Sequence, residues 1–185
     1  MKPHITIYFG LGLVTLFVGI IFLISLVNVG NCDSPPLPNV NWTECIFVGK
    51  DLSEVDLEGA NLRYVDLSSA SLLNVNLDGA DLSDAVLIKT DMRFASLEDA
   101  NLVNAQLEEA DLRFTNFKNA DLRDANLNFA NMENATFENA NLDGAYITDA
   151  NLKFASLKNT TITNTSFFNS NLECFDHDIC IKIEN

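Results

Sequence analysis

The residues most able to do chemistry lie in the carboxyl-terminal segment Cys-Phe-Asp-His-Asp-Ile-Cys, which runs from Cys174 to Cys180. Thiolate, imidazole and carboxylate groups are all ligands of divalent metals. The spacing matches no zinc motif, however, and a disulfide between the two cysteines would remove both thiolates as ligands. We therefore expect no metal site here, and we interpret Asp176, His177 and Asp178 as a solvated turn.

The four cysteines fall into two pairs at the two ends of the polar part of the chain, Cys32 with Cys45 and Cys174 with Cys180. An even number of cysteines outside the cytosol suggests disulfides. We expect two disulfides that act as structural staples rather than as redox centres.

No other group of residues indicates catalysis. The other histidine is His4, and the sequence contains neither a glycine-rich phosphate loop nor a nucleophile elbow. Carboxylate pairs occur in any chain with 26 Asp and Glu residues, and here their positions follow a repeat. We expect a protein that is not an enzyme, with no catalytic, cofactor-binding or metal-binding residues.

The chain consists of an apolar amino-terminal part and an acidic body. All 26 acidic residues lie from Asp33 onward, whereas Lys2 is the only Lys or Arg among the first 30 residues. A body this acidic is repelled by nucleic acid and by anionic lipid, and it attracts basic partners. We therefore expect no nucleic-acid partner.

Residues 5–29 are uncharged and long enough to span a bilayer. At about 1.5 Å per residue, a helix of this length exceeds the roughly 30 Å hydrocarbon core. We expect residues 1–30 to be an uncleaved signal anchor; a cleaved signal peptide, which would release a secreted protein, is the alternative. Because Lys2 precedes the span and Asp33 follows it, the positive-inside rule predicts that the body lies in a periplasm, a thylakoid lumen or the cell exterior.

Apolar residues recur with a period of five through most of the body. From Trp42 to Leu172, all 27 positions spaced five apart are apolar. Of the 20 positions from Ala60 to Ala155 that lie two residues before an apolar one, 16 are Ala, and the residue between is mostly Asp or Asn. A helix requires apolar spacing near 3.6 and a strand near 2, so neither fits. A square coil fits if each pentapeptide forms one side, with its central and small residues pointing inward.

A second period, of 20 residues, supports this geometry. The triplets Met92-Arg93-Phe94, Leu112-Arg113-Phe114 and Leu152-Lys153-Phe154 recur at multiples of 20. Equivalent residues should therefore stack along the coil, which rises about 4.8 Å per turn. We expect the Asp or Asn before each central residue to satisfy backbone groups at the corners.

The segments ANLRYVDLSSASL, ADLSDA, ANLVNAQLEEADL and ANLDGA match the motif A(D/N)LXX, and over residues 40–172 the chain resembles the pentapeptide repeat proteins. The resemblance implies an all-β fold, a right-handed quadrilateral β-helix, here preceded by one transmembrane helix. The sequence is also similar to exported or membrane-anchored members of the family from bacteria, cyanobacteria in particular. We interpret residues 31–45 as a linker and amino-terminal cap, and residues 173–185 as a carboxyl-terminal cap or tail.

Two outward surfaces could bind a partner. One is a cationic and aromatic stripe formed by Arg93, Phe94, Arg113, Phe114, Lys153 and Phe154. The other is a more apolar wall with Ile46, Val48, Val86, Ile88, Phe129, Tyr146 and Phe168. The alternative interpretation of the stripe is that its Phe residues only pack along the wall.

We therefore predict a non-enzymatic, extracytoplasmic structural or protein-interaction module that binds an unknown protein partner. We expect it to contact the membrane through its amino-terminal helix. We expect the protein to be a monomer or an end-to-end or side-by-side dimer. The alternative comes from the resemblance to cytosolic family members that mimic DNA and bind gyrase. Dense acidic stripes would favour this alternative. The negative charge is instead spread over all four faces and interrupted by Arg and Lys.

Overall fold

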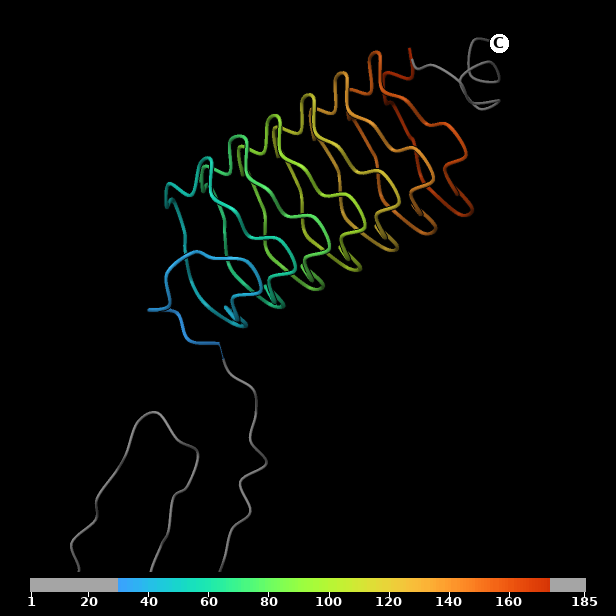
Figure 1. Cartoon of the computed structure of the whole chain (residues 1–185). Coiled ribbons are helices and arrows are strands. Elements are labelled where there is room, and N and C mark those ends of the chain that lie inside the picture. Colours follow the sequence, from blue (N-terminus) through green and yellow to red (C-terminus); the bar gives the residue numbers. More distant parts are fainter. Residues whose placement is uncertain (1–29, 174–185) are drawn as a thin grey trace, which may run out of the picture.

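The computed structural model describes residues 30–173 of the 185-residue chain. These residues wind into a rod of stacked coils that advances steadily from one end to the other (Figure 1). Isolated parallel bridges pair residues 20 apart, from Asn41 with Asn61 to Asn151 with Asn171. The predicted 20-residue coil is thereby confirmed. Within residues 30–173 every paired segment is a single residue long, and no helix is present.

The bridges form four ladders, which begin at Asn41, Ile46, Asp51 and Asp56. Each ladder belongs to one side of the coil, and the four sides follow one another along the chain. We name each wall after the first residue of its ladder. A wall is thus a stack of pentapeptides, each with a bridge residue, a central apolar residue, two turn residues and a small residue.

The backbone of each pentapeptide is closed by hydrogen bonds, which a solenoid requires because every coil is partly buried between its neighbours. In residues 81–85 all five N–H groups have acceptors. They donate, in chain order, to Ala60 O (2.9 Å), Asn101 O (2.7 Å), Asp81 Oδ1 (3.1 Å), Val103 O (2.9 Å) and Leu82 O (3.1 Å).

The third of these bonds explains why Asp or Asn precedes the central residue. The N–H of the first turn residue has no backbone acceptor, and the side-chain oxygen two residues earlier accepts from it instead. Where the bridge residue is Ser96, the oxygen comes from the coil below: Asp78 Oδ1 accepts from Glu98 N at 2.8 Å. The predicted role of the corner Asp and Asn residues is confirmed.

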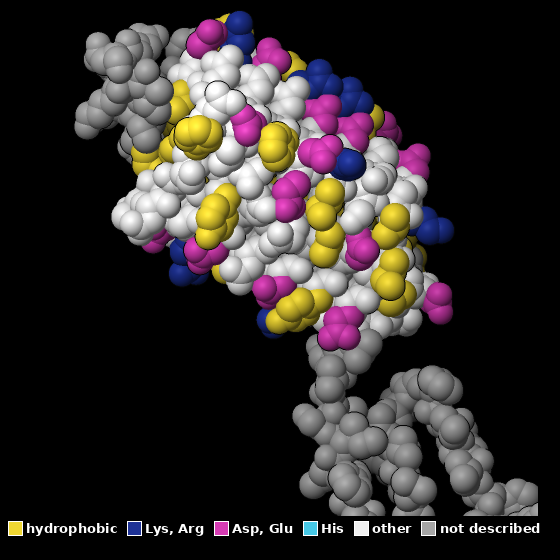
Figure 2. Space-filling view, turned by 180° about the vertical axis from the view of Figure 1, so that it is seen from behind, with side chains coloured by type: hydrophobic (Ala, Val, Ile, Leu, Met, Phe, Trp, Pro, Cys, Tyr) yellow, Lys and Arg dark blue, Asp and Glu magenta, His cyan; other side chains and the backbone are white. Residues whose placement is uncertain are grey.

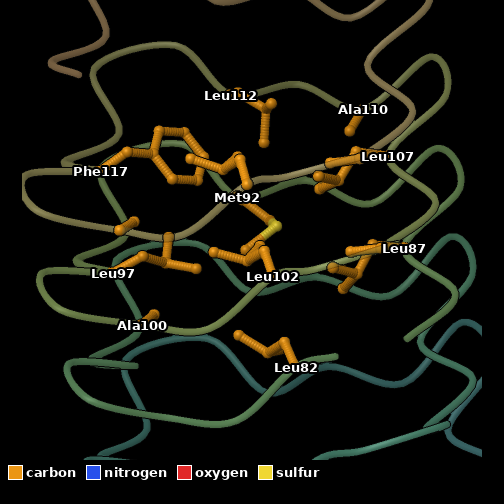
Figure 3. Close-up of a cluster of buried hydrophobic side chains, with 14 of the residues drawn as sticks. Leu82, Leu87, Met92, Leu97, Ala100, Leu102, Leu107, Ala110, Leu112 and Phe117 are labelled. Atoms are coloured by element: carbon orange, nitrogen blue, oxygen red, sulfur yellow. The ribbon is translucent and has the colours of Figure 1, made fainter. Parts of the chain in front are cut away.

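The core consists of the central and small side chains, which point inward from all four walls (Figure 3). The central residues from Leu62 to Leu157 are fully buried. Among them, the rings of Phe117 and Phe137 stack inside the rod with centroids 4.9 Å apart. Thr replaces Ala at some small positions, and its hydroxyl then donates to a backbone carbonyl, as Thr115 Oγ1 does to Met92 O at 2.9 Å. A polar side chain is thus accommodated without an unpaired group.

Residues 30–45 close the amino-terminal end. Gly30 N donates to Thr43 O at 3.1 Å, and Asn31 N donates to Asn41 O at 3.0 Å. A disulfide joins Cys32 to Cys45, the pairing that the sequence suggested. Trp42 is only 2% exposed and donates from Nε1 to Ser34 O at 3.1 Å.

At the other end, Ile162 and Phe167 are only partly buried by the described residues. The predicted pair of Cys174 and Cys180 lies outside them, as does the predicted span at residues 5–29. Among residues 30–173 no helix is long and apolar enough to cross a membrane.

Candidate interaction surface

The second turn residue of each pentapeptide has a left-handed backbone conformation. From Asn39 to Asn169, all 27 residues spaced five apart have φ between 55° and 73°. They follow the pattern of type II turns, whose third residue requires positive φ and favours Gly or Asn. Asn, Asp or Gly accordingly occupies 17 of the 27 positions.

Four of the remaining positions are Phe, and one is Tyr64. A left-handed conformation destabilises a residue with a Cβ by roughly 1–2 kcal/mol, and only Asn and Asp reduce this penalty through local hydrogen bonds. The turn therefore does not favour Phe at Phe94, Phe114, Phe129 and Phe154. The other five positions hold Glu, Ser or Lys, so the Phe residues differ from them by an exposed apolar ring rather than by their backbone.

Phe94 and Phe114 lie one above the other on the Asp51 wall. Their rings are stacked, with centroids 5.0 Å apart and planes 7° from parallel, and each residue is about half exposed. Phe154 lies on the same wall two coils beyond Phe114, and the Lys153 ammonium is 5.0 Å from its ring centroid. The structure thus aligns the aromatic members of the predicted stripe, with Asn134 between Phe114 and Phe154.

The cationic members of the stripe are paired with carboxylates. Arg93 Nη2 is 2.7 Å from Asp91 Oδ2, and Arg93 Nε is 3.7 Å from Asp111 Oδ2. Arg113 Nη2 is 2.6 Å from Asp111 Oδ2. The hydrogen bond from Arg93 holds the pKa of Asp91 below its ordinary value, and the carboxylates in turn raise the pKa of both guanidinium groups. The charge of this surface is therefore balanced, and aromatic contact is its distinctive property.

The predicted apolar wall is the Ile46 wall. Its exposed apolar residues fall into two groups, Ile46 and Val48 at the amino-terminal end and Phe129, Tyr146 and Phe168 toward the other end. Val86 and Ile88 are half-buried between these groups. On the face drawn in Figure 2, exposed hydrophobic side chains form several small patches separated by acidic, basic and uncharged polar surface. The structure thus does not join this wall into one continuous apolar surface.

The Asp56 wall carries two ladders that the sequence interpretation missed. Glu98, Lys118, Glu138 and Lys158 alternate in charge on successive coils, with Lys118 Nζ 2.7 Å from Glu98 Oε1 and Lys158 Nζ 3.2 Å from Glu138 Oε1. Beside them Asn119, Asn139 and Asn159 donate side-chain hydrogen bonds along the rod, beginning at Asp99 Oδ1. The alternation at 20-residue spacing was the signal for them. These groups satisfy one another, so this wall offers little to a partner.

No group of three or more His, Cys, Asp or Glu side chains within residues 30–173 has the arrangement of a metal site. The carboxylates that the structure describes on the Asp51 wall serve the turns and the arginines instead. The described surface carries stacked aromatic rings, exposed apolar side chains and hydrogen-bonded polar side chains.

Comparison with known families identifies the class of protein. The family model of pentapeptide repeats matches residues 37–74, 51–88, 66–102, 100–139 and 137–173. The chain belongs to the pentapeptide repeat family. Pentapeptide repeat proteins form right-handed β-helices, and the four-walled parallel coil of this chain is that fold.

Solved structures of the same family resemble the chain, whereas no curated protein matches it significantly. HetL of the cyanobacterium Nostoc sp., involved in heterocyst differentiation regulation, is 28% identical over 77% of this chain and 81% of its own, with a TM-score of 0.30. A thylakoid-lumen protein of Arabidopsis thaliana is 36% identical over 53% of this chain and 61% of its own, with a TM-score of 0.23.

QnrB1, a plasmid-mediated fluoroquinolone resistance protein, is 16% identical over 80% of this chain and 87% of its own, with a TM-score of 0.41. All of these TM-scores are low, so the likenesses add nothing about function to the family match.

Proposed function

We propose that this pentapeptide repeat protein is a non-enzymatic interaction module, tethered to a membrane and exposed outside the cytoplasm, that binds a protein partner through the Asp51 wall. The observation that carries the proposal is the stacked pair of Phe94 and Phe114 in left-handed turn positions. A cofactor has no role in it.

The stack alone does not account for these two residues. An aromatic pair contributes about 0.5–1.5 kcal/mol beyond burial. The left-handed backbone opposes each Phe by a similar amount, so it offsets the stacking contribution, and only the burial of about half of each ring favours Phe over Asn. Each side chain also remains about half exposed, which leaves apolar area that only a partner would cover.

The charge of the molecule indicates the kind of partner. The formal net charge is −15, so nucleic acid is repelled and a basic or neutral protein surface is favoured. Since Arg93 and Arg113 are already paired with Asp91 and Asp111, an acidic partner would have to displace these contacts. The rod itself acts as a monomer, or as an end-to-end or side-by-side dimer.

Site-specific crosslinking in the native membrane tests this surface. A photoreactive amino acid replaces Phe114 in one variant and Asn104 in another; Asn104 is an exposed residue at the equivalent turn position of the Asn41 wall. We expect a discrete protein adduct from position 114 that is absent at position 104 and disappears when Phe94 is replaced by Asn. Equal adducts at both positions, or none at 114, would refute a partner site on the Asp51 wall.

Tethering is proposed for residues 5–29, with Lys2 on the cytoplasmic side and the rod in a periplasm, a thylakoid lumen or the cell exterior. The disulfide between Cys32 and Cys45 supports an oxidising compartment. Membership of an exported, cyanobacterial branch of the family is part of the same proposal. Release of the rod after signal cleavage is the alternative.

Trapping of free thiols in intact cells tests tethering and compartment together. Alkylation is followed by isolation without reductant and by measurement of intact mass and amino terminus. We expect retained Met1 and four unmodified cysteines. Cleavage near residue 30 would show a secreted protein, and alkylation of all four thiols would show a cytosolic one.

Gyrase binding by DNA mimicry is not favoured by the described surface. DNA presents regularly spaced negative charge, whereas the Asp56 wall alternates Glu98, Lys118, Glu138 and Lys158. Arg93, Arg113 and Arg123 likewise neutralise carboxylates on other walls. A supercoiling assay with purified gyrase addresses this alternative directly, and we expect no inhibition.

A further inference from the structure

The first described residues, Gly30 and Asn31, are held directly against the first coil of the solenoid. Gly30 and Asn31 are already hydrogen-bonded to Thr43 and Asn41, and the disulfide from Cys32 to Cys45 follows at once. A Cβ on Gly30 would lie 2.4 Å from Thr43 N, so the entering chain is pressed against the backbone of the first coil. Residue 30 is therefore a fixed point of the rod.

The same end of the rod exposes apolar side chains. Leu37 is 56% exposed, Ile46 is 74% exposed and Val48 is 52% exposed. One coil further along the Ile46 wall, the positions of Ile46 and Val48 are taken by the polar residues Asp66 and Ser68. Three exposed prolines, at positions 35, 36 and 38, lie beside Leu37 in the cap. This apolar group thus ends with the first coil and is separate from the group of Phe129, Tyr146 and Phe168 further along the same wall.

These two features place the end of the rod at the bilayer if residues 5–29 span it. One residue extends at most about 3.6 Å, and Gly30 directly follows the predicted span. A core of about 30 Å takes about 20 of the residues from 5 to 29, so at most about five remain as a link, and the first coil lies within about 20 Å of the hydrocarbon core. We infer that the amino-terminal end of the solenoid lies on the membrane surface, with Leu37, Ile46 and Val48 inserted at the interface. This inference rests on the membrane tether proposed above.

The charged residues at this end of the rod indicate whether it would lie on anionic or on uncharged lipid. Asp33, Glu44 and Glu54 are exposed at this end, and Lys50 is the cation among them. Anionic headgroups would repel such a surface, because charges within about a Debye length interact strongly. The inferred occupant is therefore the interfacial region of an uncharged bilayer.

Fluorescence quenching by lipids tests the inference in the full-length chain. An environment-sensitive fluorophore is attached to single cysteines in Leu37→Cys, Ile46→Cys and Phe168→Cys variants, with the unsubstituted chain as the labelling blank. Phe168 is the matched control, because it is 75% exposed on the same wall as Ile46 and lies six coils away, roughly 30 Å at 4.8 Å per coil. Each variant is reconstituted into phosphatidylcholine vesicles that contain a nitroxide lipid labelled near the headgroup.

We expect the probes at 37 and 46 to be blue-shifted and quenched several-fold more than the probe at 168. If the protein floats with the vesicles but all three probes are quenched equally weakly, the tether stands and the docking of the first coil is wrong. Quenching at only one of positions 37 and 46 would still support docking and would show which wall tilts toward the bilayer. If the protein does not float with the vesicles, the tether fails, and the docking inference fails with it.

Discussion

At the scale of single residues, the left-handed turn position separates residues required by the fold from residues tolerated by it. Asn, Asp and Gly suit its positive φ, and they occupy most of these positions. Phe94, Phe114, Phe129 and Phe154 do not suit it, and each is exposed. The buried Phe117 and Phe137 form an equally close stack at central positions, where the core requires apolar volume.

This contrast predicts effects of very different size on stability for the two stacked pairs. Phe94→Asn should change the free energy of unfolding by less than about 1 kcal/mol, because relief of the left-handed strain offsets the lost stack. Phe137→Ala should destabilise the protein by about 3–5 kcal/mol, because it leaves a cavity in a fully buried layer. Urea unfolding of both variants measures the difference. A comparable loss from Phe94→Asn would mean that the exposed stack is structural.

At the scale of the pentapeptide, the side chain of the bridge residue accepts hydrogen bonds both from its own turn and from the next coil. Asp81 Oδ1 accepts from Ser83 N at 3.1 Å, from Ser83 Oγ at 2.7 Å and from Asn101 Nδ2 at 3.0 Å. It therefore closes its own turn and also ties that turn to the next coil. Oxygen acceptors at this position replace the backbone acceptor that the turn geometry cannot supply.

Removal of the Asp81 carboxylate should therefore destabilise the coil. Asp81→Ala leaves the N–H of Ser83 without its acceptor, and we expect a loss of about 1–3 kcal/mol in the free energy of unfolding. Asp81→Asn retains an acceptor oxygen and should lie close to the unsubstituted protein. Thermal and urea unfolding measure both variants, and equal stability of the Ala and Asn variants would contradict the role given to this oxygen.

The amino-terminal cap is a second element whose geometry can be tested. A methyl group on Gly30 would lie 2.6 Å from Trp42 C and from Thr43 O, and backbone atoms cannot move aside as a flexible side chain can. Gly30→Ala should therefore displace the cap and expose Trp42, the only tryptophan of the chain. We expect a red shift of tryptophan emission and increased quenching by iodide.

Gly79→Asn is the matched control for the cap. A Cβ at position 79 would have no other atom within 4 Å, and Asn tolerates the positive φ of 65° there. This variant should keep the emission of the unsubstituted protein. Unchanged emission from Gly30→Ala would show that the cap accommodates a side chain at its entry point.

At the scale of the whole molecule, the surface is an acidic rod whose charges are organised by the coil spacing. Glu98 and Lys118 are paired across one coil, and Arg123 is paired with Asp121 within its own turn. Such exposed pairs each contribute little to stability. Their main effect is to place Lys and Arg beside carboxylates, so that the local charge of the surface is balanced at these pairs. The exposed aromatic side chains are then the groups most suited to contact a partner.

The arginine pairs also predict how the rod responds to acid. Hydrogen bonds from Arg93 and Arg123 hold the pKa values of Asp91 and Asp121 below their ordinary value. A carboxyl group whose pKa is lower when folded stabilises the protein above its unfolded pKa of about 3.9, and this contribution is lost as the pH falls through the folded pKa. Stability should therefore decrease below about pH 4.

The double variant Asp91→Asn, Asp121→Asn lacks these two titrations and provides the test. Its free energy of unfolding should fall less steeply between pH 4 and pH 2 than that of the unsubstituted protein, while the Asn oxygens still accept from the turn N–H groups. Urea unfolding at a series of pH values gives the two slopes. Identical slopes would mean that the arginine pairs add nothing to acid sensitivity.

The sequence by itself determined the period of five, the 20-residue coil, the inward Leu and Ala residues and the corner role of Asp and Asn. Each of these depends on residues close in the chain and on a repeat that leaves one register, so the pattern alone specified them. Placement of Phe94 above Phe114 also followed from that register.

Only the tertiary structure decided how side chains on neighbouring coils meet. It pairs Arg93 with Asp91 and Asp111, which changes a predicted cationic stripe into a balanced one. It also reveals the left-handed backbone at the Phe positions and the closure of the first coil over Trp42. Rotamers and turn dihedrals set these contacts, and the periodicity of the sequence carries no information on either.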